Sequence, residues 1–199
     1  MSGSMRVAVV ALQGDFAKHL EVLHRLGVDG RTARLPKEIE DADAVILPGG
    51  ESTTIGKLLV RYGLDEAIKK AAAAGKPIYG TCAGLILLAQ RIDEKTAERG
   101  GQPTLGLLDV TVARNAFGRQ VDSFETDLDV KGLDDAPVHA VFIRAPIVTE
   151  VGPSVEVLAE VNGKIVFVRQ GNILGSAFHP ELGDDDRIHR LFLSMSDRY

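Results

Sequence analysis

The first part of the chain alternates short apolar runs with amphipathic stretches. Residues 6–12 (RVAVVAL) form a near-continuous apolar run that ends before Gly14, which is typical of a strand buried on both faces. Residues 15–27 carry apolar side chains at helical spacing and end in Gly27, a common helix stop. A second apolar run, residues 42–50, ends in a Gly-Gly turn. We therefore predict a strand, a helix and a second strand.

The same alternation continues to about residue 90. Residues 53–74 have a helical pattern, which we expect to be interrupted near Gly63. Residues 77–81 predict another buried strand, and residues 83–90 another helix. Strands that alternate with helices in this way build a parallel sheet covered by helices.

The second half changes character. It is rich in β-branched residues, as in LGLLDVTVA, SFETDLDV and HAVFIRAP, and Asn162–Lys164 is a hairpin signal. A last helix is predicted over residues 184–196. The predicted fold class is α/β: an open, mostly parallel twisted sheet with helices on both faces and an added antiparallel part.

Composition narrows the functional classes. Of the 199 residues, 45% are hydrophobic and 26% charged, as in ordinary globular proteins, and the net charge of −5 disfavours a nucleic-acid binder. No apolar run approaches the roughly 18 to 20 residues of a membrane span, and no signal peptide is visible. We expect a cytoplasmic protein with one domain over residues 5–199, residues 1–4 being an N-terminal extra before Met5.

Three loops follow predicted strands: LPGGESTT (residues 47–54), GTCAG (residues 80–84) and FHPEL (residues 178–182). In open α/β sheets, ligands bind beyond the carboxyl ends of the strands. We therefore expect these loops to converge on one site.

The single cysteine, Cys82, lies between Gly80 and Gly84. The Gly-x-Cys-x-Gly spacing matches a nucleophile elbow, in which a sharp strand-to-helix turn exposes the nucleophile and the helix dipole favours the thiolate. The alternative is a small cysteine packed beneath a helix. One cysteine also excludes an internal disulfide and a cysteine-rich metal site.

His179 is the best candidate for the base that a cysteine nucleophile needs. It follows a predicted strand, and Glu181 lies two residues later, on the same side of an extended chain. Glu181 can then bond one imidazole nitrogen while the other faces Cys82, which is the logic of a catalytic triad. The remaining four histidines are expected to have surface or packing roles: His19, His24, His139 and His189.

The Gly-Gly turn offers backbone donors for an oxyanion, and the amide of Ala83, next after the nucleophile, offers a second. GGESTTIGKLL resembles a phosphate-binding P-loop only superficially, because Glu51 and Leu58 stand where that motif needs Gly and Ser or Thr. A helix N-cap by Ser52 or Thr53 is the structural role expected here.

Taken together, LPGGESTT, GTCAGLILLA, RNAFGRQ, FIRAP and FHPEL resemble the glutaminase subunits of pyridoxal 5'-phosphate synthase, a branch of the class I (triad) glutamine amidotransferases. The resemblance runs from about Arg6 to Leu193. GTCAG and HPE alone indicate the superfamily, whereas GGESTT with RNAFGRQ indicates this branch. One departure is Ile147, where many relatives carry histidine after FIRAP.

The resemblance implies a role for each candidate residue. Cys82 is the nucleophile, His179 the base and then the acid, and Glu181 the residue that orients the imidazole. Gly50 and Ala83 supply the oxyanion hole. Contacts to glutamine are implied for Gly50, Glu51, Ser52, Arg114, Ile143 and Arg144. The alternative role for either arginine is a surface or salt-bridging residue.

The implied reaction is hydrolysis of L-glutamine to glutamate and ammonia, with no cofactor and no metal. The resemblance implies a separate synthase subunit that receives the ammonia and activates the glutaminase. Two other interpretations remain open: an amidotransferase subunit serving another acceptor, and a redox-sensing α/β protein with a reactive Cys82.

Overall fold

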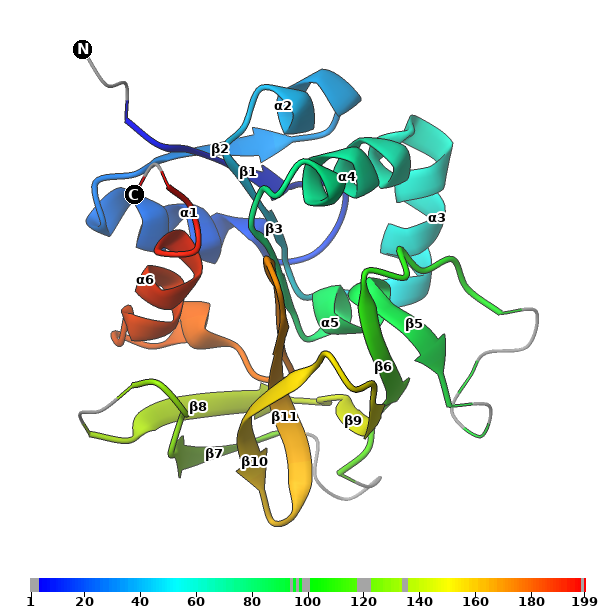
Figure 1. Ribbon diagram of the computed structural model, residues 1–199, viewed down its shortest axis with the longest axis vertical. Coiled ribbons are helices and arrows are strands. Elements are labelled where there is room, and N and C mark those ends of the chain that lie inside the picture. The colour runs from blue at the N-terminus through cyan, green and yellow to red at the C-terminus, as the bar shows by residue number, and fades with distance from the viewer. Residues whose placement is uncertain are drawn as a thin grey trace.

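The computed structural model describes residues 4–93, 95, 97, 101–117, 123–133, 136–197 and 199, and a 10-stranded sheet is its main feature (Figure 1). One half of the sheet is parallel, in the order β2-β1-β3-β4-β12. These strands are β1 (Arg6–Val10), β2 (Asp29–Ala33), β3 (Ala44–Leu47), β4 (Ile78–Thr81) and β12 (Ile173–Ser176). Strands β1, β3 and β4 are almost wholly buried, as their apolar runs predict.

The sheet continues as β12-β11-β9-β6-β5, in which β12, β11, β9 and β6 pair antiparallel and β5 pairs parallel with β6. These strands are β11 (Lys164–Gln170), β9 (Ile147–Val151), β6 (Leu108–Ala113) and β5 (Ala89–Ile92), with β10 (Glu156–Val161) paired to β11. The predicted α/β class with an added antiparallel part is confirmed. The hairpin signal is also confirmed, because Asn162 and Gly163 join β10 to β11 with positive φ angles of 50° and 73°.

Helices cover both faces of the parallel half (Figure 1). Helix α1 (Phe16–Arg25) and helix α6 (Arg187–Leu193) lie on one face, and α3 (Ser52–Tyr62), α4 (Leu64–Ala73) and α5 (Ala83–Leu88) lie on the other. The short α2 (Pro36–Glu40) packs beside α4. None of the helices in the described part of the chain combines the length and apolar character needed to cross a membrane.

Several element boundaries differ from prediction. The break at Gly63 is confirmed: its φ of 72° ends α3, and α4 begins at the next residue. The helix predicted over residues 83–90 is wrong at its end, because Ala89 already belongs to β5. The last helix is shorter than predicted. Strands β2 and β5 were not predicted; both are edge strands at the two ends of the sheet order, where a strand needs no continuous apolar run.

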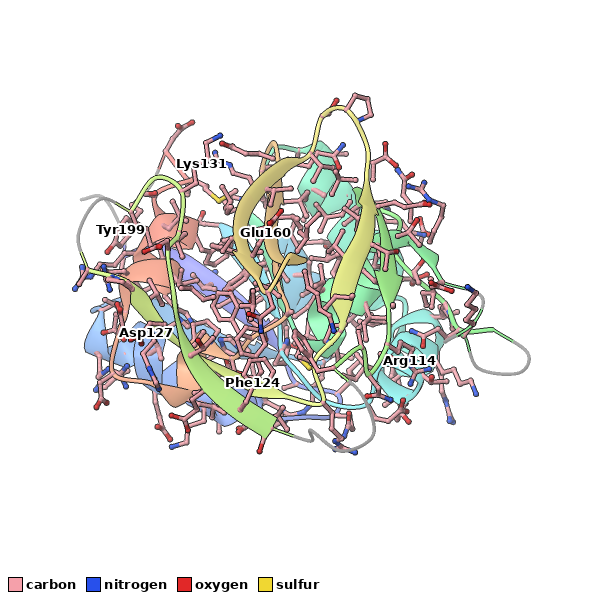
Figure 2. All side chains as sticks on the ribbon, turned by 90° about the horizontal axis from the view of Figure 1, so that it is seen from below. Arg114, Phe124, Asp127, Lys131, Glu160 and Tyr199 are labelled. Atoms are coloured by element: carbon pink, nitrogen blue, oxygen red, sulfur yellow. The ribbon has the colours of Figure 1, made fainter. Side chains whose placement is uncertain are left out.

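A separate two-stranded sheet of β7 (Ser123–Leu128) and β8 (Val138–Ile143) packs on the main body through aromatic rings. Phe124, labelled in Figure 2, stacks on Phe142 with ring centroids 4.5 Å apart. Phe142 in turn contacts Phe178, which directly precedes the predicted base. This aromatic contact therefore ties the small sheet to the loop that carries His179.

Candidate active site

The loops at the carboxyl ends of β1, β3, β4, β6 and β12, together with the segment after β8, enclose one cleft of about 390 Å³. The cleft contains every residue that the sequence singled out for the site except Glu181, which lies behind it. The lining residues are Gln13, Asp15, Gly49, Gly50, Glu51, Ser52, Cys82, Ala83, Ile86, Arg114, Asn115, Ile143, Arg144, His179 and Leu182.

Cys82 occupies a strained turn between β4 and α5. Its φ of 51° and ψ of −104° lie in a region that residues with a side chain rarely adopt. Its amide donates to the carbonyl of Ser176 on β12 at 2.8 Å, which anchors the turn to the sheet. The side chain is 9% exposed and faces the cleft, with Sγ 3.8 Å from the carbonyl oxygen of Ile143. A nucleophile-elbow geometry is therefore present.

The two glycines beside Cys82 are required by close backbone approaches. A Cβ on Gly80 would lie 2.5 Å from the carbonyl carbon of Gly84. A Cβ on Gly84 would in turn clash with the carbonyl oxygen of Leu47 on β3. The glycine pattern thus lets α5 begin directly against the sheet and places Cys82 at its first turn.

His179 lies beside Cys82 and is held from two sides. Its backbone amide donates to the carbonyl of Val141 on β8 at 2.9 Å, and its Nδ1 lies 2.7 Å from Oε1 of Glu181. Burial opposes its protonation, but hydrogen bonds to Cys82 and Glu181 outweigh burial and raise the pKa of His179 to about 10. A Cβ on Gly49 would lie 2.7 Å from His179 Cε1, so the Gly-Gly turn gives the ring its space.

Glu181 lies in the short 3₁₀ helix η1 (Pro180–Leu182) and is 3% exposed. Burial alone would raise the pKa of Glu181, but the imidazoles of His19 and His179 outweigh it and hold the pKa below its ordinary value. A buried carboxylate therefore faces the far nitrogen of the His179 ring, which is the contact that the two-residue spacing predicts.

Two histidines expected to have packing or surface roles contact this centre from behind. His19 on α1 and His189 on α6 are both fully buried, and His19 Nε2 lies 3.6 Å from Glu181 Oε1. His24, by contrast, is exposed. The contact of His19 with Glu181 was not predicted. The helical pattern can show that His19 lies on a buried side of α1, but it does not show which residues pack against that side.

The LPGGESTT loop lies against the cleft with Gly50 at a φ of 153°. The predicted N-cap by Ser52 or Thr53 is wrong. Glu51 is the N-cap of α3, and its carboxylate accepts the amides of Thr53 at 3.0 Å and Thr54 at 2.8 Å. Ser52 is the first residue of α3 and not the residue before it, and its hydroxyl donates a hydrogen bond to Gln102 Oε1 at 3.1 Å.

Arg114 and Arg144 enter the cleft from two different sheets. Arg114, labelled in Figure 2, follows β6 and has Nη2 3.6 Å from Glu51 Oε1. Arg144 follows β8 with a positive φ of 42°, next to Ile143, which is 38% exposed. Of the RNAFGRQ motif, residues 118–120 lie outside the described residues.

Gln13 and Asp15 also line the cleft and were missed. Gln13 Oε1 accepts the amide of Glu51 at 2.9 Å and so ties the loop after β1 to the LPGGESTT loop. The sequence did contain a signal for both residues. They directly follow the first predicted strand, whose carboxyl end lies at the same edge of the sheet as the other three loops.

Among the side chains that the structure describes, no group of three or more His, Cys, Asp or Glu residues is arranged to hold a metal ion. The cleft instead combines a thiol, a basic imidazole and two arginines, with the buried carboxylate of Glu181 behind the imidazole. These groups fit acyl transfer from a small substrate that carries a carboxylate.

Comparison with known proteins agrees with this chemistry. Residues 9–198 match the SNO glutamine amidotransferase family. The pyridoxal 5'-phosphate synthase subunit PdxT of Herpetosiphon aurantiacus is 57% identical over 192 residues, which cover 96% of this chain and 100% of that protein. The PdxT subunit of Carboxydothermus hydrogenoformans is 54% identical over 189 residues, covering 95% and 96%.

Solved structures give the same result. A crystal structure of a glutamine amidotransferase superposes with a TM-score of 0.89 at 50% identity, covering 95% of this chain and 97% of that one. The family match and the identities both extend over nearly the whole chain. The chain therefore belongs to the SNO glutamine amidotransferase family.

Proposed function

We propose that this chain is the glutaminase subunit of a pyridoxal 5'-phosphate synthase, which hydrolyses the side-chain amide of L-glutamine and delivers ammonia to a synthase subunit. The observation that carries the chemistry is the placement of Cys82, on a strained turn, beside a His179 whose other nitrogen meets Glu181 at 2.7 Å. The relatives at 54 and 57% identity, named as PdxT subunits, support the biological setting.

In the proposed mechanism, the Cys82 thiolate attacks the side-chain amide carbon of glutamine and forms a tetrahedral oxyanion. The backbone amides of Gly50 and Ala83 stabilise that oxyanion. His179, protonated at neutral pH, then gives its proton to the amide nitrogen as the C–N bond breaks, and ammonia leaves. The product on the enzyme is a γ-glutamyl thioester.

His179, now neutral, takes a proton from water as that water attacks the thioester carbon. The C–S bond breaks, glutamate leaves and the Cys82 thiolate and the His179 imidazolium are restored. Glu181 remains ionised throughout and stabilises the positive charge on the imidazole, which is the role of the third residue in such triads.

Substrate recognition is assigned to the polar rim of the cleft. Arg114 and Arg144 provide guanidinium groups for the α-carboxylate of glutamine, since planar guanidinium matches a carboxylate in two parallel hydrogen bonds. Glu51 faces Arg114 and offers a negative charge for the α-ammonium group. The backbone at Gly50, Ser52 and Ile143 completes the proposed contacts.

A synthase subunit is the proposed partner because the PdxT relatives are subunits of a synthase by name. Free ammonia in water would be protonated and lost as a nucleophile, so its direct transfer to a bound acceptor enzyme is chemically favourable. Activation of the glutaminase by that partner is part of the proposal.

The test measures glutamate release from L-glutamine with and without the synthase subunit of the same organism. We expect turnover with the native chain in the presence of that subunit and its loss in Cys82→Ala and Cys82→Ser. His24→Ala serves as a matched control because His24 is exposed on the outer face of α1. Retained turnover in either cysteine variant would refute the nucleophile assignment.

A second measurement separates this proposal from redox sensing. A glutamine-analogue diazoketone should modify the chain once, at Cys82, and free L-glutamine should protect it. Because Cys82 is the single cysteine, intact-protein mass reads the site directly. Modification that glutamine does not slow would contradict a glutamine site. Absence of stimulation by the synthase subunit, with stimulation by another acceptor enzyme, would reassign the partner.

A further inference from the structure

Behind the proposed triad, buried imidazoles extend the hydrogen-bond chain away from the cleft. His189 Nε2 lies 3.0 Å from His19 Nδ1. His19 Nε2 lies 3.2 Å from Thr81 Oγ1 and 3.6 Å from Glu181 Oε1. His19, Thr81 and His189 have no exposed surface, and Glu181 is 3% exposed.

The chain is assembled from distant parts of the sequence. His19 comes from α1, Thr81 is the last residue of β4 directly before Cys82, and His189 comes from α6. Burying two imidazoles costs free energy that apolar side chains of similar size would not cost, unless the ring nitrogens are bonded. Their placement against a buried carboxylate therefore calls for a functional explanation.

Both histidines are neutral at pH 7. Burial lowers the pKa of His19, and the charge of His179 adds to this, while Glu181 and Asp15 oppose it. Burial lowers the pKa of His189 to about 3, helped by His19 and Arg25 and opposed by Glu181. Burial also raises the pKa of the neighbouring Tyr79 well above its usual value, so that phenol stays neutral.

Neutrality fixes where the protons lie. A neutral imidazole has one N–H donor and one acceptor nitrogen, whereas an ionised carboxylate only accepts. An unprotonated His19 Nε2 would direct its lone pair at the Glu181 carboxylate 3.6 Å away, which is repulsive, so we assign the proton to Nε2. It then lies between the Thr81 hydroxyl at 3.2 Å and that carboxylate, and His19 Nδ1 is the acceptor. His189 Nε2 then donates to His19 Nδ1 at 3.0 Å. The nitrogen left without a hydrogen-bond partner among the described residues, His189 Nδ1, is an acceptor rather than an N–H.

We propose that His19, held by His189 as the Nε2–H tautomer, is a positioning residue that keeps Glu181 ionised and directed at His179. This proposal deepens the glutaminase function proposed above and rests on it. His19 does not touch the cleft and acts only through Glu181.

The need for such a residue follows from the surroundings of Glu181. Its Oε1 contacts His179, while its Oε2 is buried and has no hydrogen-bond partner within the part of the chain that the structure describes. A carboxylate so poorly solvated takes up a proton readily unless positive groups or donors face it. Without the His19 N–H, Glu181 becomes a weaker partner and the His179 imidazolium loses stabilisation.

The first experiment is nuclear magnetic resonance of the native free subunit with ¹⁵N-labelled histidine, which needs no turnover. We expect His189 to remain a neutral Nε2–H tautomer from pH 5 to pH 8 and His179 to stay protonated over the same range. His19 should be a neutral Nε2–H tautomer at pH 7 and take up a proton only below the ordinary histidine pKa. Protonation of His19 near the ordinary histidine pKa of about 6.5, or an Nδ1–H tautomer at His19, would overturn the proposal.

The second experiment compares three variants. His19→Leu removes the donor at similar bulk, His19→Gln keeps an amide donor near the position of Nε2, and His24→Leu is the matched exposed control on the same helix. We expect His19→Leu to lower the pKa of His179 in the same titration, and the other two variants to leave it near the native value.

Turnover with the synthase subunit gives an independent reading. We expect His19→Leu to lower kcat by about 10- to 100-fold, by analogy with the outer partners that orient metal-bound histidines, with KM for glutamine within about twofold. The basic limb of its pH profile should move to lower pH, and His19→Gln should restore most of the rate. A lower rate with an unmoved pH profile and an unmoved His179 titration would show a purely structural role and refute the proposal.

Should His19→Leu fail to fold, His189→Phe provides the alternative, because His189 packs against Tyr79 at a ring-centroid distance of 6.1 Å and Tyr79 packs in turn against Phe192. That variant removes the donor to His19 Nδ1, so we expect the Nδ1–H tautomer to become populated at His19 and the pKa of His179 to fall. An unmoved tautomer together with an unmoved His179 titration counts against the proposal. The two proposals fail separately. If Cys82→Ala retains turnover, the glutaminase site is wrong whatever the titrations show, whereas loss of turnover in Cys82→Ala with uncoupled His19 and His179 refutes only the role of His19.

Discussion

Gly80 and Gly84 face each other across the turn that carries Cys82, so closely that a methyl group on Gly80 would lie 2.5 Å from the carbonyl group of Gly84. The spacing of the two glycines in the sequence thus corresponds to a packing requirement. Cys82 lies between these two glycines and has a positive φ angle, and its amide donates a hydrogen bond to the carbonyl of Ser176.

Substitution Gly80→Ala should therefore destabilise the fold. The added methyl group meets backbone atoms that have no room to move, and overpacking of this kind costs roughly 1–3 kcal/mol. Denaturant unfolding should show a lower free energy of unfolding. Gly183→Ala is the matched control, since its Cβ would meet nothing closer than 3.9 Å. Equal stability of the two variants would contradict the close approach.

Glu181→Gln should lower turnover and narrow its pH range. The amide keeps the shape of the Glu181 side chain but removes its negative charge. That charge and the hydrogen bonds of His179 to Cys82 and Glu181 together raise the pKa of His179 to about 10. We expect a loss of about 10²- to 10⁴-fold in kcat, as for other triads that lose this charge. The basic limb of the pH profile should shift to lower pH. An unchanged limb would show that Glu181 does not set the protonation of His179.

Arg114→Met should weaken substrate binding more than chemistry. A charge-assisted hydrogen bond contributes about 1.5–3 kcal/mol, so KM for glutamine should rise about 10- to 100-fold with a smaller change in kcat. Steady-state kinetics with the synthase subunit measure both. Arg61→Met is the control, because Arg61 lies over the ring of Tyr62 on α3. A fall in kcat at constant KM would contradict the assignment of Arg114 to the α-carboxylate.

Stability should fall between pH 6.5 and pH 4.5 because of the buried histidines. The pKa of His189 is lowered to about 3, so the unfolded state binds its proton near pH 6.5 while the folded state does not. Stability is then complete above pH 6.5 and decreases by about 1.4 kcal/mol per pH unit for this group as the pH falls. His179, whose pKa is raised, is protonated in both states once the pH is well below 6.5, so it contributes little to the slope there.

The measurement is the free energy of unfolding at several pH values for the native chain and for His189→Phe. We expect a smaller slope in the variant, since one of the groups that stays neutral on folding is gone. His24→Leu should keep the native slope because His24 is exposed. Identical slopes in all three chains would mean that His189 accepts a proton in the folded state.

Much of the parallel half was predictable because its strands are buried on both faces and therefore have unbroken apolar runs. Edge strands β2 and β5 were not predictable in this way, since half of their environment is solvent and their composition is polar. The end of α5 was misjudged for a related reason. Residues 83–89 are buried whether helical or extended, so an apolar run there does not distinguish the two.

The candidate active site shows the same division between features that local sequence expresses and features that it does not. Three candidates could be identified from local spacing alone: Cys82, His179 and Glu181. Glycines on both sides of Cys82 indicate a tight turn, and His179 and Glu181 are two residues apart, which places them on one side of an extended segment. The capping role of Glu51 was missed, although it depends on neighbouring residues only, because serine and threonine are preferred N-cap residues and glutamate is not.

By itself, the amino-acid sequence determined the order of the buried strands and main helices of the parallel half, and it indicated the strand ends that bear the candidate reactive groups. Only the tertiary structure decided that Gln13 bonds to Glu51 and that His19 and His189 lie behind Glu181. The reason is physical: hydrophobic periodicity shows that a residue is buried, but the partner of a buried polar group is set by how helices from distant parts of the chain pack together.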